Sequence, residues 1–154
     1  MILGVDPGVS IVGYGFVQGS RSKPNIVDFG VLQTEKTDRE NGHFRLLEIG
    51  QDFEFLLQKY KPDVAVVEDL FFFKNAKTVI QVAQSRGVIL YLLTKYHVKV
   101  ISKTPLQVKQ TLTGYGRATK RQVQEMVKKI YRLDKIPQPD DAADALAIAW
   151  LGLL

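Results

Sequence analysis

Four carboxylates stand where apolar segments end or where a helix is expected to begin. Asp6 ends the first short apolar run of the chain, and Glu68 ends a later one. Asp141 and Asp144 open an alanine-rich segment, and a spacing of three residues places them on one face of a helix. If the two apolar runs are neighbouring strands, Asp6 and Glu68 lie together beyond their carboxyl ends, where functional groups gather in open α/β sheets.

Carboxylates that share one cleft repel one another, and this repulsion raises the pKa of each. A divalent cation relieves the repulsion, and ligation by oxygen alone favours Mg²⁺ or Mn²⁺ over zinc. Two such ions about 4 Å apart are able to hydrolyse a phosphodiester by in-line displacement. The chain has no cysteine, which excludes thiol nucleophiles, thiolate metal ligands and disulfides. The acids therefore predict metal-dependent chemistry at a phosphate.

Each acid taken alone also has an ordinary structural explanation. Asp6 precedes Pro7-Gly8, as a turn residue would, and Asp141 in a first helical turn would stabilise the helix dipole. The adjacent Asp140 is expected to be the N-cap of the last helix. Taken together, two strands that end in acids and a core helix that carries two more favour the functional interpretation.

Hydrophobic periodicity predicts the elements that hold these acids. Strands are expected at residues 2–6, 12–18, 25–34, 64–67 and 98–101. Helices are expected at residues 40–60 and 76–95, after Thr104-Pro105, after Thr119 with Gln122 as a capping box, and at 140–152. Phe44 and Leu47 belong to the apolar stripe of the first helix. The order predicts one α/β domain spanning 1–154, with a mixed five-stranded sheet (three antiparallel strands, then parallel strands) flanked by helices.

The chain is basic, with 21 Lys and Arg against 16 Asp and Glu among 154 residues. A net charge of +5 favours a polyanionic partner such as nucleic acid. No apolar run approaches the ~20 residues of a membrane helix, and no secretion signal is visible. We therefore expect a cytoplasmic protein that does not associate with a membrane.

Five groups of residues follow one another in an informative order. They are residues 2–8 with 13–15, residues 67–71 with 74–76, residues 84–88, residues 107–111 with 114–116, and residues 141–147. Each motif alone is weak. As an ordered set from Met1 to about Leu151, they resemble the RuvC family of four-way (Holliday) junction resolvases.

The resemblance implies a ribonuclease H-like fold and a homodimer that resolves four-way junction DNA by paired symmetric nicks, in homologous recombination and DNA repair. It also implies that the RuvA and RuvB branch-migration proteins are partners. The catalytic residues and metal ligands that it implies are Asp6, Glu68, Asp141 and Asp144. They would hold Mg²⁺, two ions per active site, for which Mn²⁺ can substitute. Some family members carry His at the position of Asp144, where this chain keeps the acid.

Aromatic and basic residues match positions that the family uses on DNA. Phe71 falls where the family uses an aromatic ring to disturb bases at the junction centre, and a stacked base is worth about 1–3 kcal/mol. For Phe72 and Phe73, packing against neighbouring elements is the alternative. Lys109 and Lys120 match basic positions near the scissile phosphate. The other residues expected to contact DNA are Lys74, Arg117 and Arg121, with a solvated helix face as the alternative for the two arginines.

Two other functions are compatible with these residues. A ribonuclease H-type enzyme uses the same carboxylates on RNA–DNA hybrids, and a non-catalytic junction-binding module would need only the DNA contacts. The segment that begins at Phe71 and the basic stretch from Gly114 to Arg121 favour the junction enzyme over the hybrid nuclease. The presence of all four acids disfavours the non-catalytic module.

Overall fold

A five-stranded mixed sheet forms the centre of the computed structural model, which describes residues 1–34, 42–70 and 76–154. Its strand order is β3-β2-β1-β4-β5. The strands are β1 (Ile2–Asp6), β2 (Ile11–Ser20), β3 (Lys23–Gln33), β4 (Val64–Glu68) and β5 (Lys99–Lys103). β1, β2 and β3 pair antiparallel, whereas β4 pairs parallel with both β1 and β5. The predicted mixed sheet is confirmed. Phe71, Phe72, Phe73 and Lys74 lie outside the described residues.

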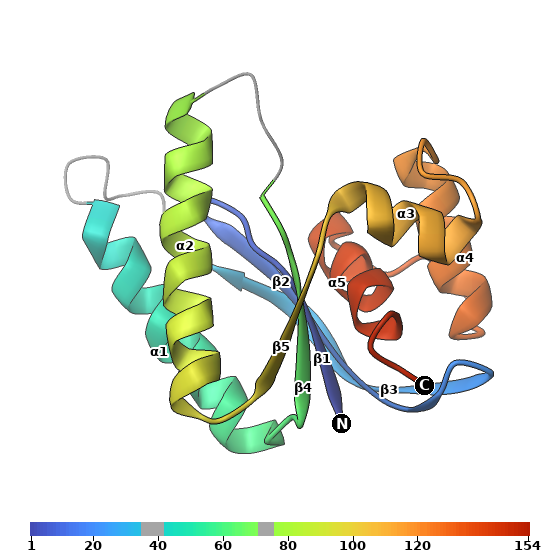
Figure 1. Ribbon diagram of the computed structural model, residues 1–154, viewed down its shortest axis with the longest axis horizontal. Coiled ribbons are helices and arrows are strands. Elements are labelled where there is room, and N and C mark those ends of the chain that lie inside the picture. The colour runs from blue at the N-terminus through green and yellow to red at the C-terminus, as the bar shows by residue number, and fades with distance from the viewer. Residues whose placement is uncertain (35–41, 71–75) are drawn as a thin grey trace.

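Helices cover both faces of this sheet (Figure 1). On one face lie α1 (Gly42–Tyr60) and α2 (Ala76–Lys95). On the other lie α3 (Pro105–Thr113), α4 (Lys120–Ile130) and α5 (Asp140–Trp150). α5 contacts β1 and β2 directly, and α4 packs on α5 farther from the sheet. In the described ranges, no helix combines the length and the apolar character needed to cross a membrane.

Local sequence determines where α3 and α4 begin. The Thr104 hydroxyl accepts a hydrogen bond from the backbone N–H of Gln107, and the Gln107 side chain accepts one from the backbone N–H of Thr104. Thr119 and Gln122 form the same reciprocal pair at the start of α4. The capping box expected at Thr119 is confirmed. Gly114 caps the end of α3 with a left-handed φ of 77°, a conformation that costs a glycine little.

The two faces of the sheet are packed with different kinds of residue. The core under α1 and α2 contains large side chains, among them Phe16, Phe53, Leu57, Ile89 and Leu93. On the other face, strand glycines meet the backbone of α5. A Cβ atom on Gly4 would lie 2.1 Å from the carbonyl oxygen of Ala145, and one on Gly13 would lie 2.1 Å from that of Asp141. Glycine at these strand positions therefore allows α5 to rest directly on β1 and β2.

The apolar stripe expected along the first helix is only partly buried. Phe44 and Leu47 are 52% and 54% exposed, whereas Phe53 and Leu57 are buried. The reason is geometric: α1 contacts β3 and α2, and its first turns carry apolar side chains that neither element covers.

Candidate active site

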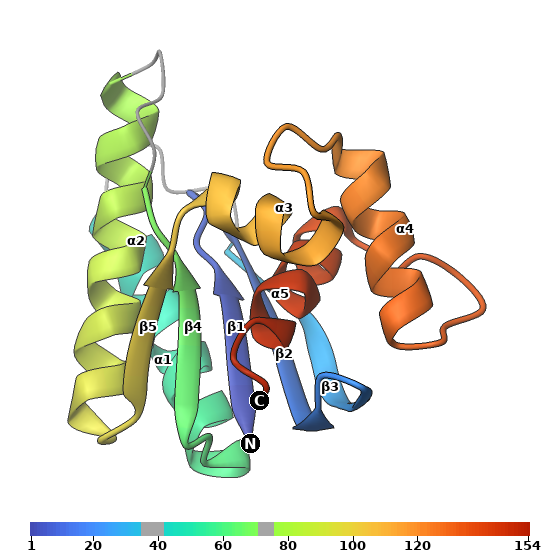
Figure 2. The ribbon, with the colours of Figure 1, turned by 45° about the vertical axis from the view of Figure 1, so that its right-hand side comes forward.

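Asp6 and Glu68 end two neighbouring parallel strands. Val5 of β1 pairs with Val67 of the parallel strand β4. Asp6 and Glu68 are the next residues of these strands, and they therefore stand side by side. Val5 and Val67 belong to the core under α1 and α2, and side chains alternate along a strand. The two acids therefore face the layer of α3 and α5. Figure 2 shows β1, β4 and β5 pointing toward the end of the sheet where α3 begins.

α5 brings Asp141 to the same end of the sheet. Gly13 is the β2 partner of Asp6, and a Cβ atom on Gly13 would lie 2.1 Å from the carbonyl oxygen and 3.3 Å from the Cβ of Asp141. The first turn of α5 thus lies directly over Gly13, beside Asp6. Asp144 follows on the same helix face and lines one cavity together with Glu68. The structure therefore gathers the four acids singled out in the sequence at one end of the sheet.

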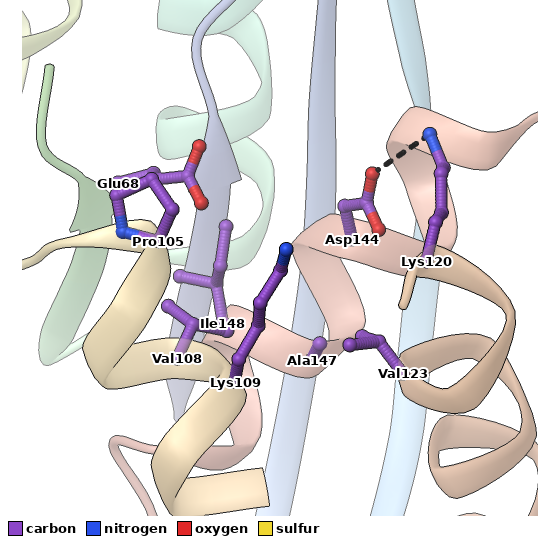
Figure 3. A pocket seen from close by; sticks show the side chains of 9 residues that line it. All are labelled: Glu68, Pro105, Val108, Lys109, Lys120, Val123, Asp144, Ala147 and Ile148. Carbon is purple, nitrogen blue, oxygen red and sulfur yellow. Dashed lines mark ion pairs between the residues drawn. The ribbon is translucent and has the colours of Figure 1, made fainter. Parts of the chain in front are cut away.

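The cavity beside these acids has a volume of about 200 Å³ and contains both lysines expected near the scissile phosphate. Lys109 reaches it from α3 and Lys120 from α4, as Figure 3 shows. Its apolar wall consists of Pro105, Val108, Val123, Ala147 and Ile148. Two carboxylates and two ammonium groups therefore share a partly enclosed space above an apolar floor.

Burial and mutual repulsion raise the pKa values of three of the acids. Burial raises the pKa of Asp6 well above its usual range, and the charges of Glu68, Asp144 and Asp141 raise it further, against a lowering by Lys120. Burial also raises the pKa of Glu68 to about 7, with a further contribution from Asp144 and an opposing one from Lys109. Burial raises the pKa of Asp144, against a lowering by Lys120. The site therefore favours an added positive charge.

Lys120 supplies part of that charge through two ion pairs. Its Nζ atom lies 3.2 Å from a carboxylate oxygen of Asp144, the pair drawn in Figure 3, and 3.3 Å from one of Asp140. The expectation that Asp140 caps α5 is wrong, because Pro139 is the N-cap residue and no side chain caps the helix there. Asp140 instead accepts a hydrogen bond from the amide of Gln124 at 3.0 Å. Sequence reasoning missed Gln124, although a polar residue beside Val123 in the apolar stripe of α4 was a visible signal.

The four carboxylates fit a hard divalent cation in ligand type and charge. In the described part of the chain, however, no three acidic or histidine side chains converge closely enough to hold an ion in this conformation. The Lys120 ammonium instead lies against Asp144. A metal ion would therefore require side-chain rotation at the helix end, while the strand ends already place Asp6 and Glu68 together.

Arg117 and Arg121 do not line the cavity that holds the acids. Arg121 forms an exposed ion pair with Glu125 at 3.0 Å and lines a second hollow of about 310 Å³, which also contains Tyr115 and Lys129. Arg117 is exposed in the loop before α4. The two arginines therefore lie outside the cavity that contains the acids, Arg117 in the loop before α4 and Arg121 in the first turn of α4.

Comparison with known families agrees with the motifs and the fold. The family model described as "Crossover junction endodeoxyribonuclease RuvC" matches residues 2–151 of this chain. The chain belongs to the RuvC family. A curated RuvC from Fusobacterium nucleatum is 50% identical over 147 residues, which cover 96% of this chain and 76% of that protein. The RuvC of Thermosipho melanesiensis is 48% identical over 149 residues, covering 97% and 94%.

Solved RuvC structures share the architecture. The structure described as Thermus thermophilus RuvC in complex with Holliday junction substrate matches with a TM-score of 0.89 at 31% identity, over 97% of this chain and 90% of that one. A yeast mitochondrial and a fowlpox virus resolvase are 18% and 19% identical, with TM-scores of 0.65 and 0.61, and share the fold alone. The expected ribonuclease H-like fold is confirmed.

Proposed function

We propose that this RuvC chain is a crossover junction endodeoxyribonuclease that resolves four-way (Holliday) DNA junctions by paired symmetric nicks, in homologous recombination and DNA repair. The observation that carries the proposal is the meeting of Asp6, Glu68, Asp141 and Asp144 at one end of the sheet, in a chain that matches RuvC along 2–151. The complex of Thermus thermophilus RuvC with a Holliday junction substrate supports the choice of DNA.

We assign these four acids as the catalytic residues and the ligands of Mg²⁺, two ions per active site, with Mn²⁺ as a substitute. When bound, the ions would activate water and stabilise the departing 3′ oxygen. Asp6 and Glu68 would hold their positions through the sheet, and Asp141 and Asp144 through one turn of α5. Lys109 and Lys120 would bind the scissile phosphate, since both line the cavity beside the acids. Residues 1–154 would act as one nuclease domain.

Aromatic residues after β4 and basic residues around α4 would hold the junction. Phe71 follows Glu68 by three residues in the sequence, and we propose that its ring stacks on a junction base and that Phe72, Phe73 and Lys74 also contact the DNA. Arg117 and Arg121 would bind phosphates of an adjoining arm.

The stacking role of Phe71 predicts that Phe71→Ala slows single-turnover cleavage more than it weakens junction binding. An unchanged cleavage rate would remove the stacking role.

Paired nicks in opposite strands require two active sites, which a homodimer supplies. Among the described residues, the α1 and α2 layer exposes large apolar side chains suited to association, namely Phe44, Leu47, Phe55, Ile80 and Tyr91. RuvA and RuvB are proposed as partners on the family's pattern alone.

Cleavage of an end-labelled synthetic four-way junction tests the function. The assay compares reactions with and without Mg²⁺, beside a linear duplex and an RNA–DNA hybrid. We expect paired nicks only in the junction and only with the metal. Asp6→Asn should abolish the nicks and leave junction binding nearly unchanged, because it removes the negative charge of a proposed metal ligand and keeps the shape of the side chain.

Three outcomes would contradict parts of the proposal. A normal cleavage rate in the Asp6→Asn variant would overturn the metal assignment. Cutting of the hybrid in place of the junction would indicate a ribonuclease H-type enzyme. Tight junction binding by the unmodified chain without nicks at any metal concentration would indicate a non-catalytic junction-binding module.

A further inference from the structure

A polar network joins the first turns of α4 and α5. The amide of Gln124 donates a hydrogen bond to one carboxylate oxygen of Asp140 at 3.0 Å, and the Lys120 ammonium lies 3.3 Å from the other. Gln124 is only 8% exposed, and a buried amide that loses its partner is costly. The orientation of Asp140 is therefore held from both sides.

Lys120 is shared between two carboxylates with different surroundings. Asp144 lines the cavity with Glu68 and is 29% exposed as a side chain, whereas Asp140 is 49% exposed and does not line that cavity. Within the described residues, these are the two carboxylates at ion-pair distance from Lys120. The Lys120 ammonium lies against the Asp144 carboxylate. A divalent cation that Asp144 binds would therefore compete with the ammonium for this carboxylate.

We propose that Asp140 is a positioning residue that retains Lys120 when Asp144 turns to bind a divalent cation. The proposal rests on the metal assignment made above. In the metal-free protein Lys120 neutralises Asp144, and it must leave before that carboxylate ligates an ion. Because Gln124 keeps Asp140 in place, the departing ammonium retains an anionic partner and stays beside the cavity that also contains Lys109.

This arrangement predicts opposite effects for the two members of the pair. Without Lys120, no described side chain forms an ion pair with Asp144, and the cation binds more tightly. Without the Asp140 charge, Lys120 has Asp144 as its remaining carboxylate among the described residues, so displacing it leaves the ammonium unpaired and the cation binds more weakly. A residue that only stabilised the fold would not produce affinity changes of opposite sign.

Titration of the DNA-free protein with Mn²⁺, followed by the paramagnetic resonance signal of the free ion, measures this directly. Lys120→Met, which keeps an unbranched apolar stem, should tighten Mn²⁺ binding about threefold to fivefold, as expected for a half-exposed ion pair. Asp140→Asn should weaken it by a similar factor. Gln124→Met, which frees Asp140 without changing charge, should weaken it less.

The double variant Lys120→Met/Asp140→Asn separates positioning from simple charge. Without Lys120, the effect of Asp140→Asn should shrink to that of Glu125→Gln, a control that removes one negative charge from α4 at an acid paired with Arg121. Circular dichroism and thermal unfolding show whether each variant is folded.

Several results would overturn the positioning role. One is an equal weakening by Asp140→Asn with and without Lys120, because Asp140 would then act through its charge alone. Another is an unchanged Mn²⁺ affinity in Lys120→Met. Absence of Mn²⁺ binding in every protein would contradict both this role and the metal assignment. Failure of the proposed junction cleavage would appear separately, in the assay on the unmodified chain with four-way DNA.

Discussion

The two faces of the sheet meet their helices in different ways, although both bury large apolar side chains. Under α1 and α2, large residues such as Phe16 and Phe53 fill the space between helix and strand. Under α5, Gly4 and Gly13 meet the helix backbone directly. Both faces are close-packed, but on the α5 face the contact is between backbones, which have no side chain to give way when an atom is added. The comparison indicates that the first face supplies mainly stability, and that the second also determines where Asp141 and Asp144 stand.

Among changes that compare the two faces, the largest expected effect comes from adding one methyl group to the α5 face. In Gly13→Ala, the new Cβ would lie 2.1 Å from the carbonyl oxygen of Asp141, so the first turn of α5 must move away from Asp6. A displacement near 1 Å at reacting groups costs about 100-fold in rate, and we expect a loss of that size in single-turnover junction cleavage.

Gly50→Ala is the matched control on the other face. Its methyl group would meet only the Cγ1 atom of Val88 at 3.3 Å, and we expect cleavage at the normal rate. If Gly13→Ala cleaved the junction as fast as Gly50→Ala, the contact between β2 and α5 would not position the acids.

Removing a large side chain from the α1 face should reduce stability and spare the chemistry. Phe53→Ala should lower the free energy of unfolding by about 3–5 kcal/mol, because the ring is fully buried. Urea unfolding measures this, and cleavage by the folded fraction should be unchanged. Gln51→Ala, at an exposed position of the same helix outside the proposed association surface, should cost less than about 0.5 kcal/mol. A loss of rate per folded molecule in Phe53→Ala would show that the faces are coupled.

The pH dependence of stability should originate on the α5 face. The pKa of Glu68 is about 7 in the folded protein against an ordinary value of 4.5, so the metal-free folded state retains a proton that the unfolded state releases. Stability should therefore fall as pH rises from about 4.5 through 7, and the raised pKa values of Asp6 and Asp144 act in the same direction. On the other face, hydrogen bonds from Lys95 and Tyr96 lower the pKa of Glu54, which therefore titrates below this window.

Thermal unfolding at pH 5.5 and pH 8, with a chelator and then with Mg²⁺, tests this assignment. The chelated protein should have the lower midpoint at pH 8, and Mg²⁺ should raise that midpoint. Glu68→Gln should remove part of the pH dependence. A pH dependence that Glu68→Gln leaves intact would show that Glu68 does not contribute to it.

The smallest expected effect concerns electrostatic binding at the two ends of the sheet. Lys109→Ala should reduce the slope of log affinity against log salt for junction DNA by about 1, if Lys109 binds a phosphate. Lys99→Ala removes the same charge at the first residue of β5, the end opposite the acids, and should leave the slope unchanged. Equal slopes for both variants would remove the phosphate contact of Lys109.

Much of the fold follows from local rules, which is why the sequence predicted it. Alternating or continuous apolar runs placed all five strands. Thr104 before Pro105 marked one helix start, and Thr119 with its capping box marked another. The failures involve distant partners. Asp140 satisfies every local criterion for a cap, yet its side chain bonds to Gln124 and Lys120 of α4. Phe44 has the spacing of a core residue, yet no described element covers it.

By itself the sequence determined the kinds of group in the site: carboxylates at two strand ends and one helix start, and no thiol. The two lysines were expected there from the family resemblance. Only the tertiary structure decided that Gly13 allows Asp141 to lie beside Asp6, and that Lys120 bridges Asp140 and Asp144. The physical reason is that periodicity and capping depend on neighbours within a few residues. The approach of α5 to the sheet and of α4 to α5 depends instead on strand order and on backbone contacts between segments far apart in the chain.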